Sequence, residues 1–303
     1  MIKRTICIEN PCHLKCRNEQ LVVDYHHVKG YENLPEKTAP IEDIGIVILE
    51  HQQITVSQYL LDKLVANNAA VIICNETHHP SGMLLPLESN TIQSERFRAQ
   101  IEATEPLKKQ LWQQTVKAKI SNQAVVLKKW DIKHNYLKSL SHEVKSGDAG
   151  NNEAKAAAYY WSHLFPDAWQ FFRKREGPPP NNLLNYGYAI LRATMARAIT
   201  GAGLLPALGI FHRNRYNAYC LADDIMEPYR PFVDMIVRNI IHATSAVETL
   251  TQELKVQLLK LPTVDVLLDG ETSPLMIATQ RTAASLARCY TGEQRKLLYP
   301  EMP

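Results

Sequence analysis

Short runs of hydrophobic residues, some alternating with polar ones, recur through the first ninety residues. Five of these runs are rich in valine and isoleucine and predict β-strands at residues 2–8, 21–25, 44–49, 70–74 and 83–87. Between the third and fourth runs, residues 56–68 (VSQYLLDKLVANN) carry leucines at helical spacing and end in Asn67-Asn68, which can cap a helix. The N-terminal part is therefore expected to be β-rich with one helix.

Helical periodicity dominates from about residue 94 to the end of the chain. Ser94 can cap a helix that begins at Glu95. The pattern predicts helices at residues 94–103, 106–120, 132–144, 152–164, 182–199, 216–226, 231–242, 246–261 and 274–290. Three prolines in REGPPPNN predict a loop inside this region. We therefore expect an α+β protein with two domains: a β-rich domain at 1–92 and an all-α domain at 93–303.

The composition is that of a globular chain. Of the 303 residues, 45% are hydrophobic and 21% are charged, which separates the sequence from disordered proteins. No apolar run approaches the roughly 20 residues that span a bilayer, so we expect a cytoplasmic protein without a membrane partner. The six cysteines are irregularly spaced, which favours reduced thiols. Cys12-His13-x-x-Cys16 lacks a second cysteine pair and is interpreted as strand residues rather than a zinc site.

Charge is unevenly distributed along the chain. Residues 1–100 carry a net charge of −3 and the remainder +6, so a polyanionic partner is expected to bind the C-terminal part. The sequence contains neither a Walker-type glycine-rich loop nor a dinucleotide-binding fingerprint.

Acidic residues and one histidine in the helical part suggest a metal site. Asp224 and Glu227 are three residues apart, so they share a face if the segment is helical. Glu153 opens another predicted helix, and His212 precedes the helix with Asp224. Together these four side chains can supply oxygen and nitrogen ligands to Mg²⁺ or Mn²⁺, and the imidazole favours Mn²⁺.

Each of these residues also has a purely structural interpretation. A glutamate in the first turn of a helix commonly complements the helix dipole, as Glu153 would. An isolated histidine is commonly structural. Asp224 and Glu227, with arginines nearby, can form a solvated charged face. The spacing alone leaves these alternatives open.

Three segments resemble the CRISPR-associated integrase family that acts in spacer acquisition. They are GNNEAKAAAYYWSHLF, NNLLNYGYAILRATMARAITGAGLLPALGIFH and CLADDIMEPYRP. In the N-terminal part, PIEDIGIVILEHQQIT, HHPSGMLLPLESNT and QSERFRAQI are similar to the version found in type II systems. The resemblance covers nearly the whole chain, in order.

The resemblance implies an N-terminal β domain and a C-terminal helical domain that holds the active site. The catalytic and metal-binding residues of the family fall on Glu153, His212 and Glu227. A further acid falls on Asp224, whose role varies in the family, and Asp223 is expected to be structural. The activity implied is metal-dependent insertion of short foreign DNA duplexes into a CRISPR array, by transesterification of 3′-hydroxyl ends, together with endonuclease cleavage, in antiviral defence.

The resemblance also implies partners. These are double-stranded DNA, a second copy of the chain bound through the β domains, a small second adaptation subunit and the type II effector nuclease. A non-catalytic DNA-binding scaffold is the alternative, and retention of the acids argues against it. A metal hydrolase for a small molecule is a third reading, which predicts a deep closed pocket.

Phosphate contacts are expected to provide most of the DNA affinity. The candidate DNA-binding residues are Arg173, Lys174, Arg175, Arg192, Arg197, Arg213, Arg215 and Arg230. Tyr186 and Tyr188 are expected to pack in the core rather than stack on bases. Gly187 lies inside a strong helix pattern, where glycine costs about 1 kcal/mol relative to alanine, so a neighbouring helix is expected to approach closely there.

Overall fold

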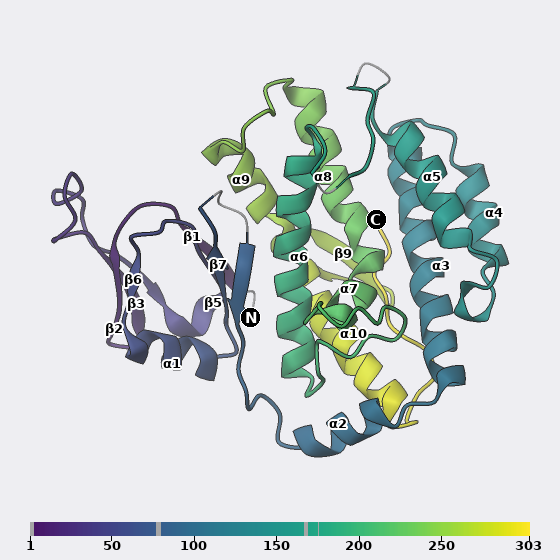
Figure 1. Cartoon of the computed structure of the whole chain (residues 1–303), viewed down its shortest axis with the longest axis horizontal. Coiled ribbons are helices and arrows are strands. Elements are labelled where there is room, and N and C mark those ends of the chain that lie inside the picture. The colour runs from purple at the N-terminus through teal and green to yellow at the C-terminus, as the bar shows by residue number, and fades with distance from the viewer. Residues whose placement is uncertain (1–2, 77–79, 167–168, 175) are drawn as a thin grey trace. The chain divides into compact units, whose positions relative to one another are not determined.

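The computed structural model describes residues 3–76, 80–166, 169–174 and 176–303. The chain divides into two compact units, Met1–Thr91 and Ile92–Pro303, one residue before the expected boundary. The first unit is β-rich with one helix and the second is mainly helical, as the hydrophobic pattern predicts (Figure 1).

Two four-stranded sheets form the first unit. One has the order β1-β5-β7-β8, in which β8 is antiparallel to β7 and the other neighbours are parallel. The second has the order β4-β3-β2-β6, with β6 parallel to β2 and the remaining pairs antiparallel. The strands are β1 (Arg4–Ile8), β2 (His13–Arg17), β3 (Gln20–Asp24), β4 (Lys37–Pro40), β5 (Ile44–Leu49), β6 (Thr55–Val56), β7 (Ala70–Cys74) and β8 (Pro80–Leu84).

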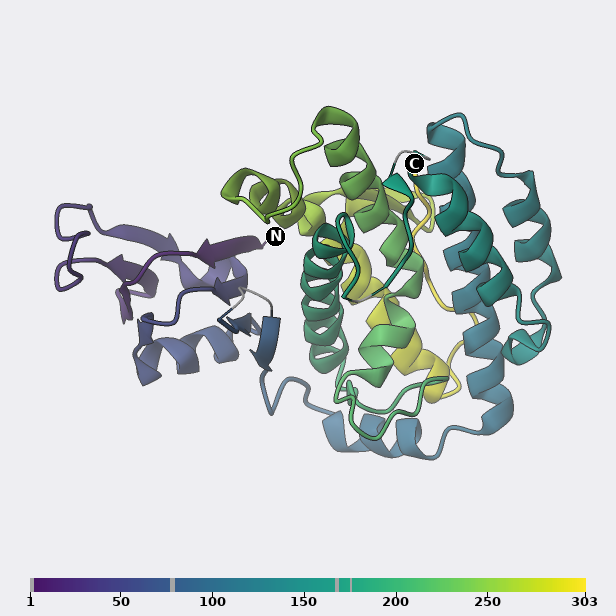
Figure 2. The ribbon, with the colours of Figure 1, turned by 45° about the horizontal axis from the view of Figure 1, so that its top comes forward.

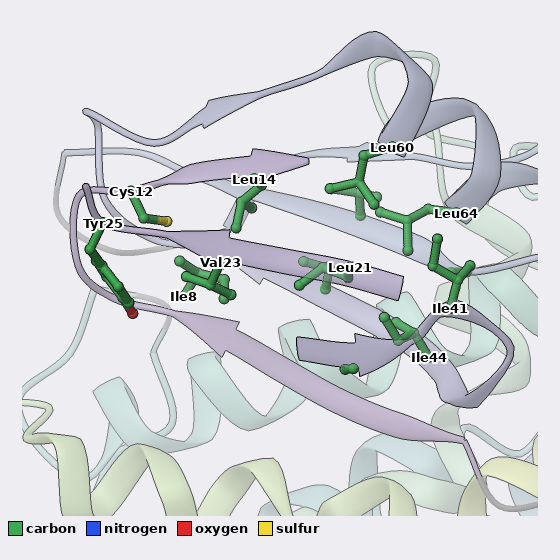
Figure 3. Close-up of a cluster of buried hydrophobic side chains, with 14 residues drawn as sticks. Ile8, Cys12, Leu14, Leu21, Val23, Tyr25, Ile41, Ile44, Leu60 and Leu64 are labelled. Atoms are coloured by element: carbon green, nitrogen blue, oxygen red, sulfur yellow. The ribbon is translucent and has the colours of Figure 1, made fainter. Parts of the chain in front are cut away.

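The core of this unit draws on both sheets and on α1 (Gln58–Ala66). Leu60 and Leu64 of α1 pack with Leu14 and Leu21 of the second sheet and Ile44 of the first (Figure 3). The Ser57 hydroxyl accepts a hydrogen bond from the backbone N–H of Leu60 and begins the helix. Asn67 caps its end and Asn68 follows in a left-handed conformation, which confirms the predicted termination.

Strands buried on both faces were the easiest to predict. The bounds of β5 and β7 agree with the prediction, whereas β8 begins three residues earlier than expected. Strands β4 and β6 were not predicted, because they are short and carry more polar residues, whereas β2 covers the segment interpreted as strand residues around Cys16. No disulfide joins any of the six cysteines, all of which lie in the described residues, as expected from their irregular spacing.

Helices of the second unit occupy most of residues 93–290 (Figures 1 and 2). They are α2 (Gln93–Ile101), α3 (Glu105–Lys129), α4 (Asn135–Glu143), α5 (Asn152–Leu164), α6 (Asn181–Gly201), α7 (Cys220–Ile225), α8 (Arg230–Ala243), α9 (Gln252–Leu259) and α10 (Leu275–Tyr290). Helix α3 packs against α4, α5 and α8, and α6 packs against α7, α8 and α10. None of the helices in the described residues has the length and apolar composition to cross a membrane.

Helices α6 and α8 approach closely at a glycine. A Cβ atom on Gly187 would lie 2.5 Å from Cγ1 of Val233, a distance that side chains do not tolerate. This confirms the expected close packing. Tyr186 and Tyr188 are buried, as expected, so neither ring is available to stack on a base.

Several helix boundaries differ from the prediction: α4 begins at Asn135 rather than 132, and α9 begins at Gln252 rather than 246. Helix α2 begins at Gln93, before Ser94, and has no side-chain cap. Helix α3 continues to Lys129 through Asn122 and Gln123, which are polar but buried. Helix α7 begins at Cys220 rather than at residue 216. The side chains of Asn214 and Asn217 accept hydrogen bonds from the backbone N–H groups two residues on, and these turns compete with the helix.

A β-hairpin inside the helical unit corrects the all-α expectation. Strands β9 (Asp265–Leu268) and β10 (Glu271–Pro274) pair in antiparallel orientation around Asp269-Gly270. Both turn residues have positive φ. Asp-Gly between short extended segments is a strong hairpin signal, so this element was readable from the sequence.

Candidate active site

Helix α5 positions Glu153 at its first turn. The carboxylate of Asp148 accepts hydrogen bonds from the backbone N–H groups of Asn152 and Glu153, both at 2.9 Å, and so satisfies the start of the helix. Since Asp148 already fills the capping role, the Glu153 side chain is free to interact elsewhere. The small, buried Ala156 one turn later lies where α5 packs on α3.

Lys119 of α3 joins the two glutamates of the predicted site. Its Nζ lies 2.7 Å from Oε1 of Glu153 and 2.6 Å from Oε2 of Glu227. Only 12% of the Lys119 side chain is exposed. Burial alone would lower the pKa of Lys119, but the negative charges of Glu227 and Glu153 outweigh it and raise the pKa. A buried ammonium ion therefore lies between the two carboxylates.

Glu227 is held on its other side by an arginine. It begins a short 3-10 turn, Glu227–Tyr229, and Nε of Arg230 donates a 2.7 Å hydrogen bond to its Oε1. Burial would raise the pKa of Glu227, but Arg230 and Lys119 outweigh it and lower the pKa to about 2. Oε2 is buried and contacts Lys119 as an ion pair, yet it receives no hydrogen bond from the described residues.

His212 lies in the loop before α7 and is oriented by Asp224. Nδ1 of His212 lies 2.5 Å from Oδ1 of Asp224. A carboxylate only accepts hydrogen bonds, so Nδ1 carries the proton in this contact and Nε2 is left as the ligand atom of the neutral ring. The hydrogen bond with Asp224 raises the pKa of His212. Burial opposes the shift, and the negative charges of Glu227 and Glu153 add to it.

The backbone around His212 is tightly constrained. Asp224 also accepts the backbone N–H of Phe211 at 2.9 Å. A Cβ atom on Gly209 would lie 2.4 Å from the carbonyl oxygen of His212, so only glycine fits there. Trp112 of α3 stacks on Phe211 with ring centroids 4.3 Å apart and meets the His212 ring edge-on. These contacts fix the position of a histidine whose side chain is 49% exposed.

The structure brings together part of the predicted ligand set. Glu153 and Glu227 meet at Lys119, and His212 is close enough for both charges to affect its pKa. The ligand atoms of Glu153, His212 and Glu227 do not all lie within 4.8 Å of one another. Asp224 is directed at His212 and the loop backbone, and it orients the histidine. Asp223 is structural, as expected, since it pairs with Arg192 and Asn217.

These side chains fit a divalent cation. Two carboxylates and an imidazole are a donor set for Mg²⁺ or Mn²⁺. The buried Oε2 of Glu227 already has a cation, the Lys119 ammonium, 2.6 Å away. A metal-binding histidine commonly donates its other ring N–H to a carboxylate, as His212 does to Asp224.

The candidate DNA-binding residues fall into distinct environments. Arg230 and Arg173 lie with Lys119 and Glu227 on a cavity of about 190 Å³. Arg213 is exposed and pairs with the exposed Glu105. Arg215 lies over the exposed ring of Tyr216, with 4.6 Å from its guanidinium carbon to the ring centroid.

The remaining candidates divide further. Lys174 is exposed, Arg192 pairs with Asp223, and Arg175 lies outside the described residues. Arg197 is a correction, because only 2% of it is exposed and it lies among the buried residues of α6. Arg197 is therefore buried and does not contribute to the positively charged surface that the sequence predicts.

Sequence reasoning missed Lys119 and Trp112. Lys119 lies on the buried face of α3, three residues after Val116 and four before Gln123, both of which are buried. A lysine in register with core positions is unusual, because lysine is almost never fully buried unless it is paired. A lysine at helical spacing from core positions was therefore the feature of the sequence that could have identified Lys119.

Comparison with known proteins places this site in a family. Residues 6–258 match the family model described as CRISPR associated protein Cas1. The chain is 35% identical over 300 residues to the CRISPR-associated endonuclease Cas1 of Neisseria meningitidis serogroup C (strain 8013), which covers 98% of this chain and 95% of that relative. It is 30% identical over 230 residues to a CRISPR-associated endonuclease Cas1 of Pyrobaculum aerophilum, covering 70% and 76% of the two chains.

Solved structures share the fold at low sequence identity. A casposase bound to its integration product has a TM-score of 0.76 at 20% identity and covers 98% of this chain and 92% of its own. A Cas1 protein from Thermotoga maritima has a TM-score of 0.72 at 17% identity and covers 96% and 98%. The two-unit α+β fold is thus that of CRISPR-associated proteins of the Cas1 type. With the match over most of its length, this chain belongs to the Cas1 family.

Proposed function

We propose that the protein is a metal-dependent DNA integrase and endonuclease of CRISPR adaptation. It would join the 3′-hydroxyl ends of short DNA duplexes to a CRISPR array by transesterification. The observation that carries the proposal is the buried bridge Glu153–Lys119–Glu227, in which two carboxylates already enclose a cation. A buried carboxylate with a strongly lowered pKa, such as Glu227, is more common at functional sites than elsewhere. The name of the 35%-identical relative, an endonuclease, supports the assignment.

Glu153, Glu227 and His212 are the residues that would hold Mg²⁺ or Mn²⁺. The bound ion would neutralise the phosphodiester and stabilise the charge that develops on its oxygens. Asp224 keeps Nε2 of His212 directed outward by holding Nδ1. The same arrangement suits His212 to carry a proton to or from a reacting oxygen when it is not a ligand.

Arginine side chains beside the carboxylates would bind the DNA backbone. Arg230 and Arg173 place positive charge on the cavity next to Glu227, where a phosphate would otherwise be repelled. The exposed Lys174, Arg213 and Arg215 would extend this surface along the DNA. His212 lines a second cavity, of about 430 Å³, together with Arg213 and Arg215. Basic side chains thus line the cavities at both Glu227 and His212, which favours a polyanion over a neutral small molecule as substrate.

Partners follow from the family and from the named relatives. We propose a homodimer formed through the β-rich unit, a small second adaptation subunit, and a place in a type II system with its effector nuclease, in the cytoplasm. Structures with the same fold include complexes described as Cas6-RT-Cas1–Cas2 and a Cas1–DNA complex, which supports binding of a second subunit and of DNA.

A strand-joining assay tests the proposal. Labelled DNA duplex and a plasmid that carries the repeat are incubated with the protein and Mn²⁺, for the natural chain, Glu153→Ala and the matched control Glu36→Ala. Glu36 lies in the first unit and pairs with Arg17. Joining that needs Mn²⁺ and is lost only in Glu153→Ala is expected. Equal joining by Glu153→Ala would instead favour the DNA-binding scaffold.

A further inference from the structure

The Nζ atom of Lys119 lies between two carboxylates, at a position where a metal ion would otherwise bind. Its Nζ donates to Oε1 of Glu153 and contacts Oε2 of Glu227. These two oxygens come from α5 and from the turn after α7, and α3 supplies the ammonium that joins them. Arg230 contacts the other oxygen of Glu227, so Lys119 is the cation that the two glutamates share.

The ammonium and a divalent ion would compete for these oxygens. Mg²⁺ requires oxygen ligands at about 2.0–2.1 Å, and its two positive charges would lie a few ångströms from the lysine nitrogen. Repulsion between such charges is strong in a site with little water. We propose that Lys119 is a built-in counter-ion of the carboxylate pair, which it holds together without metal and which it must leave when a divalent ion binds. The inference rests on the metal site of the proposed function.

The structure provides room for this exchange. The cavity of about 190 Å³ is lined by Lys119, by Gln123 one turn further along α3, and by Asp234 of α8. Asp234 is buried and already accepts hydrogen bonds from Tyr160 and Tyr188. A displaced ammonium can therefore remain in the cavity near a carboxylate without moving α3.

Two consequences distinguish this role from simple packing. Removal of the Lys119 charge removes a competitor, so the affinity for a divalent ion should rise. Without metal, the same change leaves only Arg230 to offset the charges of Glu153 and Glu227, so the protein should unfold more easily. Added metal should then restore stability, because the ion replaces the missing ammonium.

The experiment compares Lys119→Met and Lys119→Arg with Lys117→Met. Lys117 lies on the same helix, away from the two glutamates. Mn²⁺ affinity is measured by titration with electron paramagnetic resonance of the free ion, and thermal unfolding is followed with a chelator and with Mn²⁺. Lys119→Met should bind Mn²⁺ about tenfold or more tightly than the natural chain. In chelator, Lys119→Met should also melt at a lower temperature than the natural chain, and Mn²⁺ should raise its melting temperature by more. Lys119→Arg and Lys117→Met should stay near the natural affinity.

Several results would overturn the inference. Unchanged or weaker Mn²⁺ binding by Lys119→Met would show that the lysine does not compete with metal. So would a Lys119→Met protein that fails to fold even when Mn²⁺ is present throughout purification, whereas folding that depends on Mn²⁺ supports exchange. Failure of the proposed function looks different: the natural chain itself would bind no Mn²⁺ and join no DNA.

Discussion

Each unit of the protein contains a lysine between two carboxylates with a histidine nearby, and the two clusters behave differently. In the β-rich unit, Lys15 pairs with Asp24 and lies 3.7 Å from Glu36. His26 contacts Asp24 at 3.2 Å. The side chain of Lys15 is 40% exposed, against 12% for Lys119 in the helical unit. Both clusters contain the same chemical groups, and the main difference is the exposure of the lysine to solvent.

A search for ligand atoms that lie close together would select the cluster in the β-rich unit instead of the candidate active site. Asp24, His26 and Glu36 bring their ligand atoms within 4.8 Å of one another, whereas Glu153, His212 and Glu227 do not. In this surface cluster, named for its exposed lysine, Arg17 also neutralises the acids. Its carboxylates are about as exposed, at 12% for Asp24 and 26% for Glu36, as those of Glu227 and Glu153, at 9% and 25%. Exposed ion pairs contribute about 0–1 kcal/mol and need no functional explanation. Burying a charge costs far more, so the burial of the lysine, and not that of the carboxylates, distinguishes the candidate site.

The largest expected contrast is in DNA joining. Glu227→Gln removes a charge from the buried cluster and keeps the shape of the side chain. Joining should fall by about 10³-fold, because the residue would hold the metal that stabilises the reacting phosphate. Glu36→Gln makes the same change in the surface cluster and should leave joining unchanged. Rates from the labelled-duplex assay compare the two, and equal rates would place the chemistry elsewhere.

A smaller loss is expected from the loop that presents His212. Gly209→Ala places a methyl group where the carbonyl of His212 and the carboxylate of Asp224 now lie, so the loop must move. A displacement of about 1 Å at a reacting group commonly costs about 10²-fold in rate. Gly82→Ala in the β-rich unit meets nothing closer than 3.9 Å and is the matched control. A Gly209→Ala enzyme with the natural rate would show that the position of His212 is not critical.

The smallest contrast concerns protonation of His212. Because Asp224 raises the pKa of His212, Asp224→Asn should lower it, as measured by NMR titration of the imidazole. A histidine whose pKa is raised in the folded state adds stability that is present below about 6.5 and is lost as the pH rises through the folded value. Asp224→Asn should therefore destabilise the protein more at pH 6 than at pH 9.

One control variant tests the His212 titration, and a second tests DNA joining. Asp223→Asn changes the neighbouring residue, which pairs with Arg192, and should leave the His212 titration in place. Asp24→Asn alters the surface cluster and should not change joining. If the His212 titration is the same in Asp224→Asn and the natural chain, then the short contact between the two side chains does not control the proton.

Local pattern predicted many of the elements but not their exceptions. The apolar runs of β5 and β7 and the amphipathic α5 have the bounds that the sequence indicates, because burial on defined faces fixes their periodicity. The start of α7 was wrong, because the Asn214 and Asn217 side chains capture backbone N–H groups that a helix would use. The hairpin at Asp269-Gly270 was missed although its turn residues were visible.

The sequence by itself determined the two-part architecture and the family, since these depend on local periodicity and on motifs, and through the resemblance it predicted Glu153, His212 and Glu227 as site residues. Only the tertiary structure decided which side chains meet across helices distant in sequence. It placed Lys119 between two glutamates, turned Asp224 toward His212 and buried Arg197. The physical reason is that charge interactions in a site depend on distance and on exclusion of water, and neither quantity is written in the order of the residues.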